Sequence, residues 1–216
     1  MGTLERKERE KEQRRKAILK AARKVFFEYG LQSASMDMIA EIAELSKGAL
    51  YLYFKSKEDL YVSLLEEGLA ILRRMFEEVA ARPLPAGEAL REIGLAYYEF
   101  FKRHPDYFQI LKFTDARGLH SKVSQEVLQC TEKRSMGCLQ VVASVYERGM
   151  KEGIYRSDLA PMEVAVMLWG TSNGMIALIA NQQDHFIHDQ RVDFEKIMFT
   201  SWELMLTSLR ATSPAS

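Results

Sequence analysis

Lysine and tyrosine side chains recur between residues 47 and 57 at spacings that suit contact with a nucleic acid. Lys47 and Tyr51 are four residues apart, so on a helix both point to the same side, and Tyr53 lies close by. An ammonium group pairs with phosphate, and a phenol hydroxyl can donate to a phosphate or a base edge. This pattern predicts a short helix that presents its exposed face to DNA.

Two short helices and a tight turn are expected to position that face. Ser35 can cap the first helix and Ser46 the second, because a serine hydroxyl accepts the free N–H groups of an opening turn. Leu50 and Phe54, four apart, should point inward from the second helix. The first helix has a buried face of apolar and small residues: Met36, Ile39, Ala40 and Ala43. The segment therefore predicts a helix-turn-helix, preceded by a helix that Gly30 ends.

The stretch SKGALYLYFKSKEDLY closely resembles the helix-turn-helix signature of the tetracycline-repressor (TetR) family of bacterial transcriptional regulators. The similarity runs without a gap from about Arg15 to Leu65 and includes the preceding helix KAILKAARKVFFEYG. Beyond residue 65 it is a similarity of helix layout. The resemblance implies a DNA-binding domain over residues 1–56, which begins with a flexible charged arm at 1–13. It also implies an effector-binding and dimerisation domain over residues 57–216.

The resemblance also assigns roles in DNA binding. By this resemblance, Lys47 and Tyr51 would approach the major groove, while Tyr53 and Lys57 would meet phosphates. Ser35 would touch phosphate near the start of the first helix, and Gly48 would let the backbone come close to the duplex. Two positions depart from the usual pattern. Leu52 stands where many relatives carry an aromatic or polar residue, and Asp37 would repel phosphate. Both departures bear on which operator is read.

Composition favours an all-α protein of about nine helices. The chain has 216 residues, 47% of them hydrophobic, and only 5 prolines and 12 glycines interrupt it. Helices are expected from 57 to about 81 and at 88–103, 106–117, 121–152, 161–181 and 192–210. Residues 1–57 hold 13 Lys/Arg against 8 Asp/Glu, whereas the rest holds 17 against 22. This asymmetry suits a protein that approaches DNA with one end.

The last two helices are expected to form a homodimer interface. Their apolar residues recur at helical spacing: Val164, Leu168, Thr171, Met175 and Leu178 in one helix, and Met198, Trp202, Met205 and Leu209 in the other. Two such helices from each subunit can build a four-helix interface. Packing within a single chain is the alternative. A dimer would place two recognition helices about 34–36 Å apart, one turn of DNA, over a near-palindromic site.

Aromatic residues and methionines crowd the middle of the chain and could line a cavity for a lipophilic small molecule. The candidate ligand contacts are Tyr97, Phe101, Phe108, Phe113, Met150, Met167, Trp169 and Asn173. Ordinary core packing is the alternative for each of them. With a filled core and no effector, the chain would be a constitutive DNA-binding protein.

No cofactor, metal site or catalytic motif is expected. His185 and His188 are three apart, but the stretch QQDHFIHDQ predicts an exposed loop. Cys130 and Cys138 sit eight apart in one expected helix, roughly 12 Å, too far for a disulfide. A cytoplasmic location without membrane insertion is expected, although residues 159–180 are apolar. A helical enzyme or lipid carrier is a further alternative, and it would show turnover or lipid exchange without DNA affinity.

Overall fold

The computed structural model describes residues 3–114, 120–190 and 193–211, with the backbone alone for residues 3, 4, 109, 111–114, 120, 181–190 and 194. Over these ranges the chain forms nine α-helices and one 3-10 turn, and its only β-type pairing is an isolated bridge between Tyr155 and Arg210. The prediction of an all-α fold is confirmed. The chain divides into two compact units, Met1–Leu69 with His104–Arg134, and Ala70–Arg103 with Ser135–Ser216.

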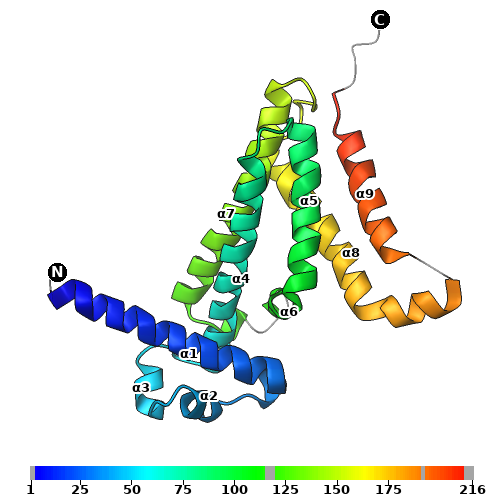
Figure 1. Cartoon of the computed structure of the whole chain (residues 1–216). Helices are drawn as coiled ribbons and strands as arrows, with labels where there is room; N and C mark the ends of the chain where they lie inside the picture. Colours follow the sequence, from blue (N-terminus) through cyan, green and yellow to red (C-terminus); the bar gives the residue numbers. More distant parts are fainter. Residues whose placement is uncertain (1–2, 115–119, 191–192, 212–216) are drawn as a thin grey trace, which may run out of the picture. The chain divides into compact units, whose positions relative to one another are not determined.

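The first unit contains the predicted helix-turn-helix. Its elements are α1 (Thr3–Ser33), α2 (Met36–Ile42), α3 (Lys47–Tyr51), the start of α4 (Lys57–Ala80), α6 (Pro105–Thr114), a 3-10 turn (His120–Lys122) and the start of α7 (Gln125–Lys151). Figure 1 shows α2 and α3 along one side of α1. Ile18, Val25 and Ile39 are completely buried among these helices. The short α2 and α3 are therefore held by packing, since helices of their length are not stable alone.

Helix α1 begins at Thr3 and includes most of the predicted flexible arm. Alternating charges support this extension through pairs four residues apart, such as Arg6 Nε to Glu10 Oε1 at 2.8 Å. At the other end, Gly30 interrupts the helix with φ 72° and ψ 166°, a conformation that favours glycine. One further turn then leads to α2. The predicted stop at Gly30 therefore marks the end of the regular helix.

The second unit contains the end of α4, α5 (Ala86–Arg103), the end of α7, α8 (Pro161–Gln190) and α9 (Phe194–Ser208). Helix α9 packs against both α5 and α8. Between α5 and α9, the Tyr98 and Phe199 rings meet edge to face with centroids 5.6 Å apart. Tyr146 and Ile176 are completely buried. This unit holds most of the residues predicted to bind an effector or to dimerise.

Helix α8 is longer than predicted, because it continues to Gln190 through the polar stretch expected to be a loop. The loop prediction was wrong: polarity alone does not end a helix, and residues 175–190 contain neither glycine nor proline. The side chains of His185 and His188 lie outside the described residues. The two compact units cut through α4 and α7, so they do not test the predicted functional division at residue 56, which stays a prediction.

Candidate nucleic-acid interface and effector site

Two serine caps mark where the helices α2 and α3 of the helix-turn-helix begin. The Ser35 hydroxyl accepts the Met38 N–H at 3.2 Å, and the Ser46 hydroxyl accepts the Ala49 N–H at 3.2 Å. Both predicted caps are confirmed. Between them, Glu44 adopts a left-handed φ of 54°, which is uncommon for a residue with a side chain. The turn is closed by the Leu45 N–H donating to the Ala40 carbonyl at 2.9 Å. Local hydrogen bonds thus fix where α3 begins.

The inward and outward faces of α3 are as predicted. Leu50 is completely buried and Phe54 is 3% exposed, so both anchor the helix in the first unit. Lys47 and Tyr51 are exposed, and Tyr51 retains 46% of its surface. Their donors are therefore available to a ligand as large as a DNA duplex.

The remaining positions around α3 differ in their availability. A Cβ at Gly48 would meet no atom within 4 Å, so this part of the helix faces open space. Tyr53 is half-buried. Leu52 is 83% exposed, which makes it the most exposed of the large hydrophobic side chains described. An apolar side chain at such a position can contact a thymine methyl group, but it offers no hydrogen bond to a base or phosphate.

Asp37 and Lys47 form an ion pair across the helix-turn-helix. The Lys47 ammonium lies 2.8 Å from one carboxylate oxygen and 2.9 Å from the other. The hydrogen bond that Lys47 donates to this carboxylate, together with the negative charge of Asp37, raises the pKa of Lys47. The pair is exposed, so water and salt screen it. Asp37 therefore both repels an approaching phosphate and competes with it for Lys47.

Lys57 has a structural role that the sequence did not suggest. Its ammonium donates to the backbone carbonyls of Leu31, Gln32 and Ala34, at 2.9, 3.1 and 2.9 Å. These three bonds use all three of its donors. They hold the turn between α1 and α2 against the start of α4. This arrangement favours a positioning role for Lys57 over the predicted phosphate contact.

Two arginines secure α1 and α7 to α4 inside the first unit. The Arg15 guanidinium lies over the Phe54 ring at 5.3 Å from its centroid. Arg15 and Arg134 both approach the carboxylate of Glu66, at 3.9 and 3.4 Å, and only 7% of that side chain is exposed. A nearly buried carboxylate needs such partners. The sequence did contain a signal for Glu66, because this charged residue falls at the helical spacing of the apolar residues of α4.

Known proteins of similar sequence settle the family. Residues 18–64 match the family described as bacterial regulatory proteins, tetR family. The HTH-type transcriptional repressor NicS of Pseudomonas putida is 30% identical over 152 residues, 70% of each chain. The chain belongs to the TetR family. As a TetR-family protein it is a DNA-binding transcriptional regulator, and the recognised family resemblance is confirmed.

Two further similarities extend over most of this TetR-family chain. The fatty acid metabolism regulator protein of Bacillus subtilis is 23% identical over 193 residues, 89% of this chain and 93% of the relative. The crystal structure of the transcriptional regulator FadR from Bacillus subtilis in complex with stearoyl-CoA superposes with a TM-score of 0.69 at 21% identity. It covers 89% of this chain and 98% of that one. This second likeness shows that the fold extends through the C-terminal half.

Three of the predicted effector contacts meet in the second unit. The Tyr97 hydroxyl donates to Asn173 Oδ1, and Trp169 forms a hydrogen bond with Tyr97. Burial raises the pKa of Tyr97, and the hydrogen bond from Trp169 opposes that rise. Phe76 of α4 lies against the Tyr97 ring, with centroids 6.2 Å apart. The cluster therefore places oriented polar groups beside aromatic rings, a combination that ligand sites share.

The other predicted effector contacts differ in their burial. Phe108 is buried in the first unit, Phe101 and Met150 are half-buried in the second, and Met167 is 42% exposed. The side chain of Phe113 lies outside the described residues. The assignment of these positions to an effector site stays a prediction.

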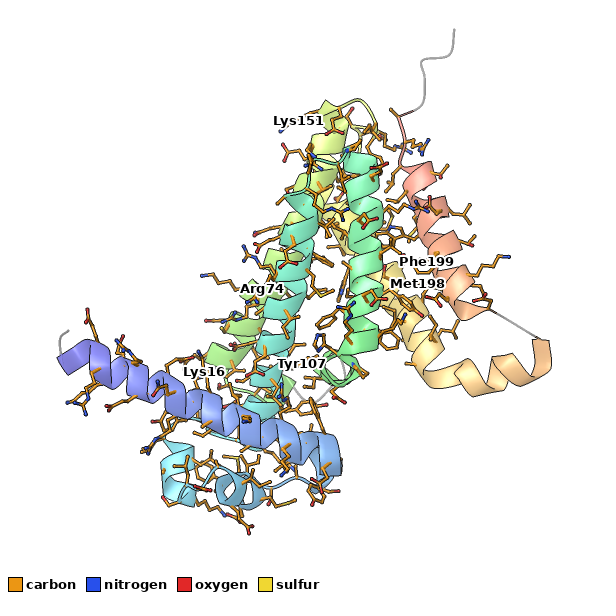
Figure 2. The ribbon with its side chains drawn as sticks, viewed as in Figure 1. Lys16, Arg74, Tyr107, Lys151, Met198 and Phe199 are labelled. Atoms are coloured by element: carbon orange, nitrogen blue, oxygen red, sulfur yellow. The ribbon has the colours of Figure 1, made fainter. Side chains whose placement is uncertain are left out.

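Most of the predicted dimer residues are inside the protomer. Five of the nine are less than 9% exposed, namely Val164, Leu168, Met198, Trp202 and Leu209. Met175, Leu178 and Met205 are half-buried, and only Thr171 is exposed. This burial favours the alternative of packing within one chain. Figure 2 shows Met198 and Phe199 on the side of α9 that faces α5.

The exposed apolar surface lies on the opposite faces of the same helices. On α8 and α9 we define an outer stripe by its exposed residues: Val166, Met167, Gly170, Thr171, Gly174, Ile197, Thr200 and Leu204. Leu204 is 66% exposed. A Cβ at Gly170 or Gly174 would meet nothing within 4 Å. The stretch Pro161–Ala180 of α8 is apolar and long enough to cross a membrane, with 33% of it buried, but packing helices also meet that test.

Proposed function

We propose that this TetR-family regulator is a cytoplasmic homodimeric repressor that a lipophilic small molecule releases from a near-palindromic operator. The observation that carries the proposal is α3, a capped helix with Lys47 and Tyr51 exposed and Leu50 buried. Two copies of α3 in one dimer would read two half-sites about one helical turn apart. Because its named relatives are regulators, we propose no enzymatic activity.

The outer stripe supports the dimer. It holds several exposed large hydrophobic residues, among them Val166, Ile197 and Leu204. Exposed apolar groups on neighbouring helices favour association with another protein surface. In a two-fold symmetric dimer, α8 and α9 of each copy would form a four-helix interface. The glycines at 170 and 174 would let the helix backbones approach closely.

The effector is best sought among acyl compounds. The second unit offers the Tyr97 cluster, in which Tyr97 itself is buried, Asn173 is half-buried and Trp169 is 36% exposed. One relative is named for fatty acid metabolism, and a structure of the same fold contains stearoyl-CoA. A long acyl chain would replace apolar side-chain contacts, and Tyr97, Trp169 and Asn173 could orient a polar head or thioester. We therefore propose an acyl-CoA or a related lipophilic molecule.

A polar network in the first unit is suited to transmit the response. The Tyr107 hydroxyl of α6 accepts from Arg23 of α1 at 3.0 Å and donates to Glu67 of α4 at 3.0 Å. The Tyr107 ring packs so closely on Gly68 that a Cβ there would overlap it. Helix α4 runs from this network into the second unit. A displacement of α4 would therefore reach α1 through Tyr107, and a ligand can shift the equilibrium only by its differential affinity.

The test is release of the bound operator by stearoyl-CoA, with coenzyme A as the control. We expect stearoyl-CoA to lower operator affinity at least tenfold and coenzyme A to leave it unchanged. Tyr107→Phe, which removes both hydrogen bonds but keeps the ring, should retain operator binding and weaken the response. Operator binding that no acyl-CoA of any chain length alters would contradict an acyl-CoA effector.

A further inference from the structure

A pocket of about 200 Å³ lies between α5 and α9 in the second unit, apart from the Tyr97 cluster. Its apolar walls come from Leu95, Met198 and Phe199. This volume exceeds the roughly 150 Å³ of an engineered apolar cavity that binds benzene. The pocket can therefore hold a molecule with a single ring or a short branched chain.

One residue that lines the pocket, Trp202, carries a buried hydrogen-bond donor without a partner. Trp202 is 7% exposed, and its Nε1–H finds no acceptor among the residues that the structure describes. The indole edge that carries Nε1 lies against Gly94, which also lines the pocket, and a Cβ at Gly94 would overlap it. A buried donor left unpaired is unfavourable. An acceptor atom on a bound molecule would satisfy it after a small shift of the indole toward the pocket, since Nε1 is covered in the present arrangement.

An ion pair stands at the edge of the same pocket. Arg91 Nε pairs with a Glu203 carboxylate oxygen, and both side chains remain about half exposed, at 62% and 47%. Since the two charges compensate, the lining of the pocket carries no net charge. An anionic ligand would be repelled by Glu203 as well as attracted by Arg91, whereas a neutral ligand would leave the pair intact. The electrostatics therefore favour a neutral molecule.

We propose that the α5–α9 pocket binds a small, neutral, largely apolar molecule whose single acceptor oxygen takes the Trp202 N–H. An aryl ketone or a short ester has this chemistry. The outer stripe occupies the other face of α9, so a ligand between α5 and α9 would act on the helix that carries the proposed dimer surface. Only this regulatory consequence rests on the proposed function; the binding does not.

The experiment follows the two indole N–H signals of the ¹⁵N-labelled full-length chain during titration. The probes are acetophenone, ethylbenzene, which has a similar shape without the acceptor, and benzoate, which is anionic. Trp169→Phe assigns the signals. We expect a saturable shift of the Trp202 signal with acetophenone, at about three- to tenfold higher affinity than with ethylbenzene or benzoate. An unmoved Trp202 signal, or equal affinity for ethylbenzene, would overturn the proposal.

Two variants and one control localise the binding. Gly94→Ala adds a methyl group against the indole, and Leu95→Phe fills the pocket from its wall if the first variant does not fold. We expect either folded variant to weaken acetophenone binding at least tenfold, while Leu204→Ala on the other face of α9 leaves it unchanged. Unchanged affinity in the pocket variants would refute the site.

The same preparation separates this proposal from the proposed function. Saturable acetophenone binding that changes neither dimer dissociation nor operator affinity confirms the pocket and contradicts only its regulatory role. A failure of the protein to bind any operator would contradict the proposed function, and the result at Trp202 would still decide whether the pocket exists.

Discussion

Helices α3 and α9 were both expected to direct a particular face outward, and only α3 does so. In α3 the outward face carries Lys47 and Tyr51, while the inward face carries Leu50. In α9 the residues expected outside, Met198 and Trp202, are buried. The two helices differ in how unlike their two faces are. Helix α3 has one polar and one apolar face, whereas α9 has apolar residues on both faces. Helical spacing identifies a face, but only a difference in polarity shows which way it points.

The sharpest test of this comparison truncates the buried face of α9. Met198→Ala should lower the free energy of unfolding by about 2–5 kcal/mol, because Met198 is 2% exposed and the change leaves a cavity. Lys196→Ala, at an exposed position of the same helix, should change it by less than about 0.5 kcal/mol. Denaturant unfolding measures both. Equal, small effects would show that Met198 is not a core residue.

The exposed face of α9 should instead control assembly. Leu204→Glu would bury a charge in the proposed interface, so we expect the dimer dissociation constant to rise at least tenfold, about 1.4 kcal/mol. Sedimentation equilibrium measures this constant, with Ser144→Glu on the exposed side of α7 as the control. A Leu204→Glu protein that dimerises as strongly as the unmodified chain would place the interface elsewhere.

Features that depend on neighbouring residues could be predicted from the sequence, whereas features that depend on distant residues could not. The caps Ser35 and Ser46 each act on a backbone group three residues away, so local sequence is enough to place α2 and α3. The three carbonyls held by Lys57 come from residues 23 to 26 positions earlier, and no local pattern reveals them. The Arg23–Tyr107–Glu67 network likewise depends on contacts that only the fold creates.

Removing a cap tests the local part of this account. Ser46→Ala should cost about 1 kcal/mol of stability, because the Ala49 N–H loses its acceptor at the start of α3. Ser157→Ala, exposed in the second unit, is the matched control. Thermal unfolding of both variants gives the difference. If Ser46→Ala matched its control, the cap would not be what holds α3 in place.

The smallest effect is expected at the ion pair beside α3. Asp37→Asn removes a negative charge near the proposed phosphates and releases Lys47, so operator affinity should rise about two- to fivefold, with a steeper dependence on salt. Glu41→Gln removes the same charge from α2 but leaves the Asp37–Lys47 pair in place, so its effect on operator affinity should be smaller. Weaker binding by Asp37→Asn would mean that Asp37 orients Lys47 for DNA.

The central claim is that α3 is the surface that reads DNA. Its most direct test is titration of DNA upstream of the chain's own gene, against a random duplex, over a range of salt concentrations. We predict selective binding that falls steeply with salt, and a loss of at least 100-fold when Lys47 and Tyr51 are both replaced by alanine. Lys24→Ala on α1 is the control. Selective binding that survives the double replacement would contradict the claim.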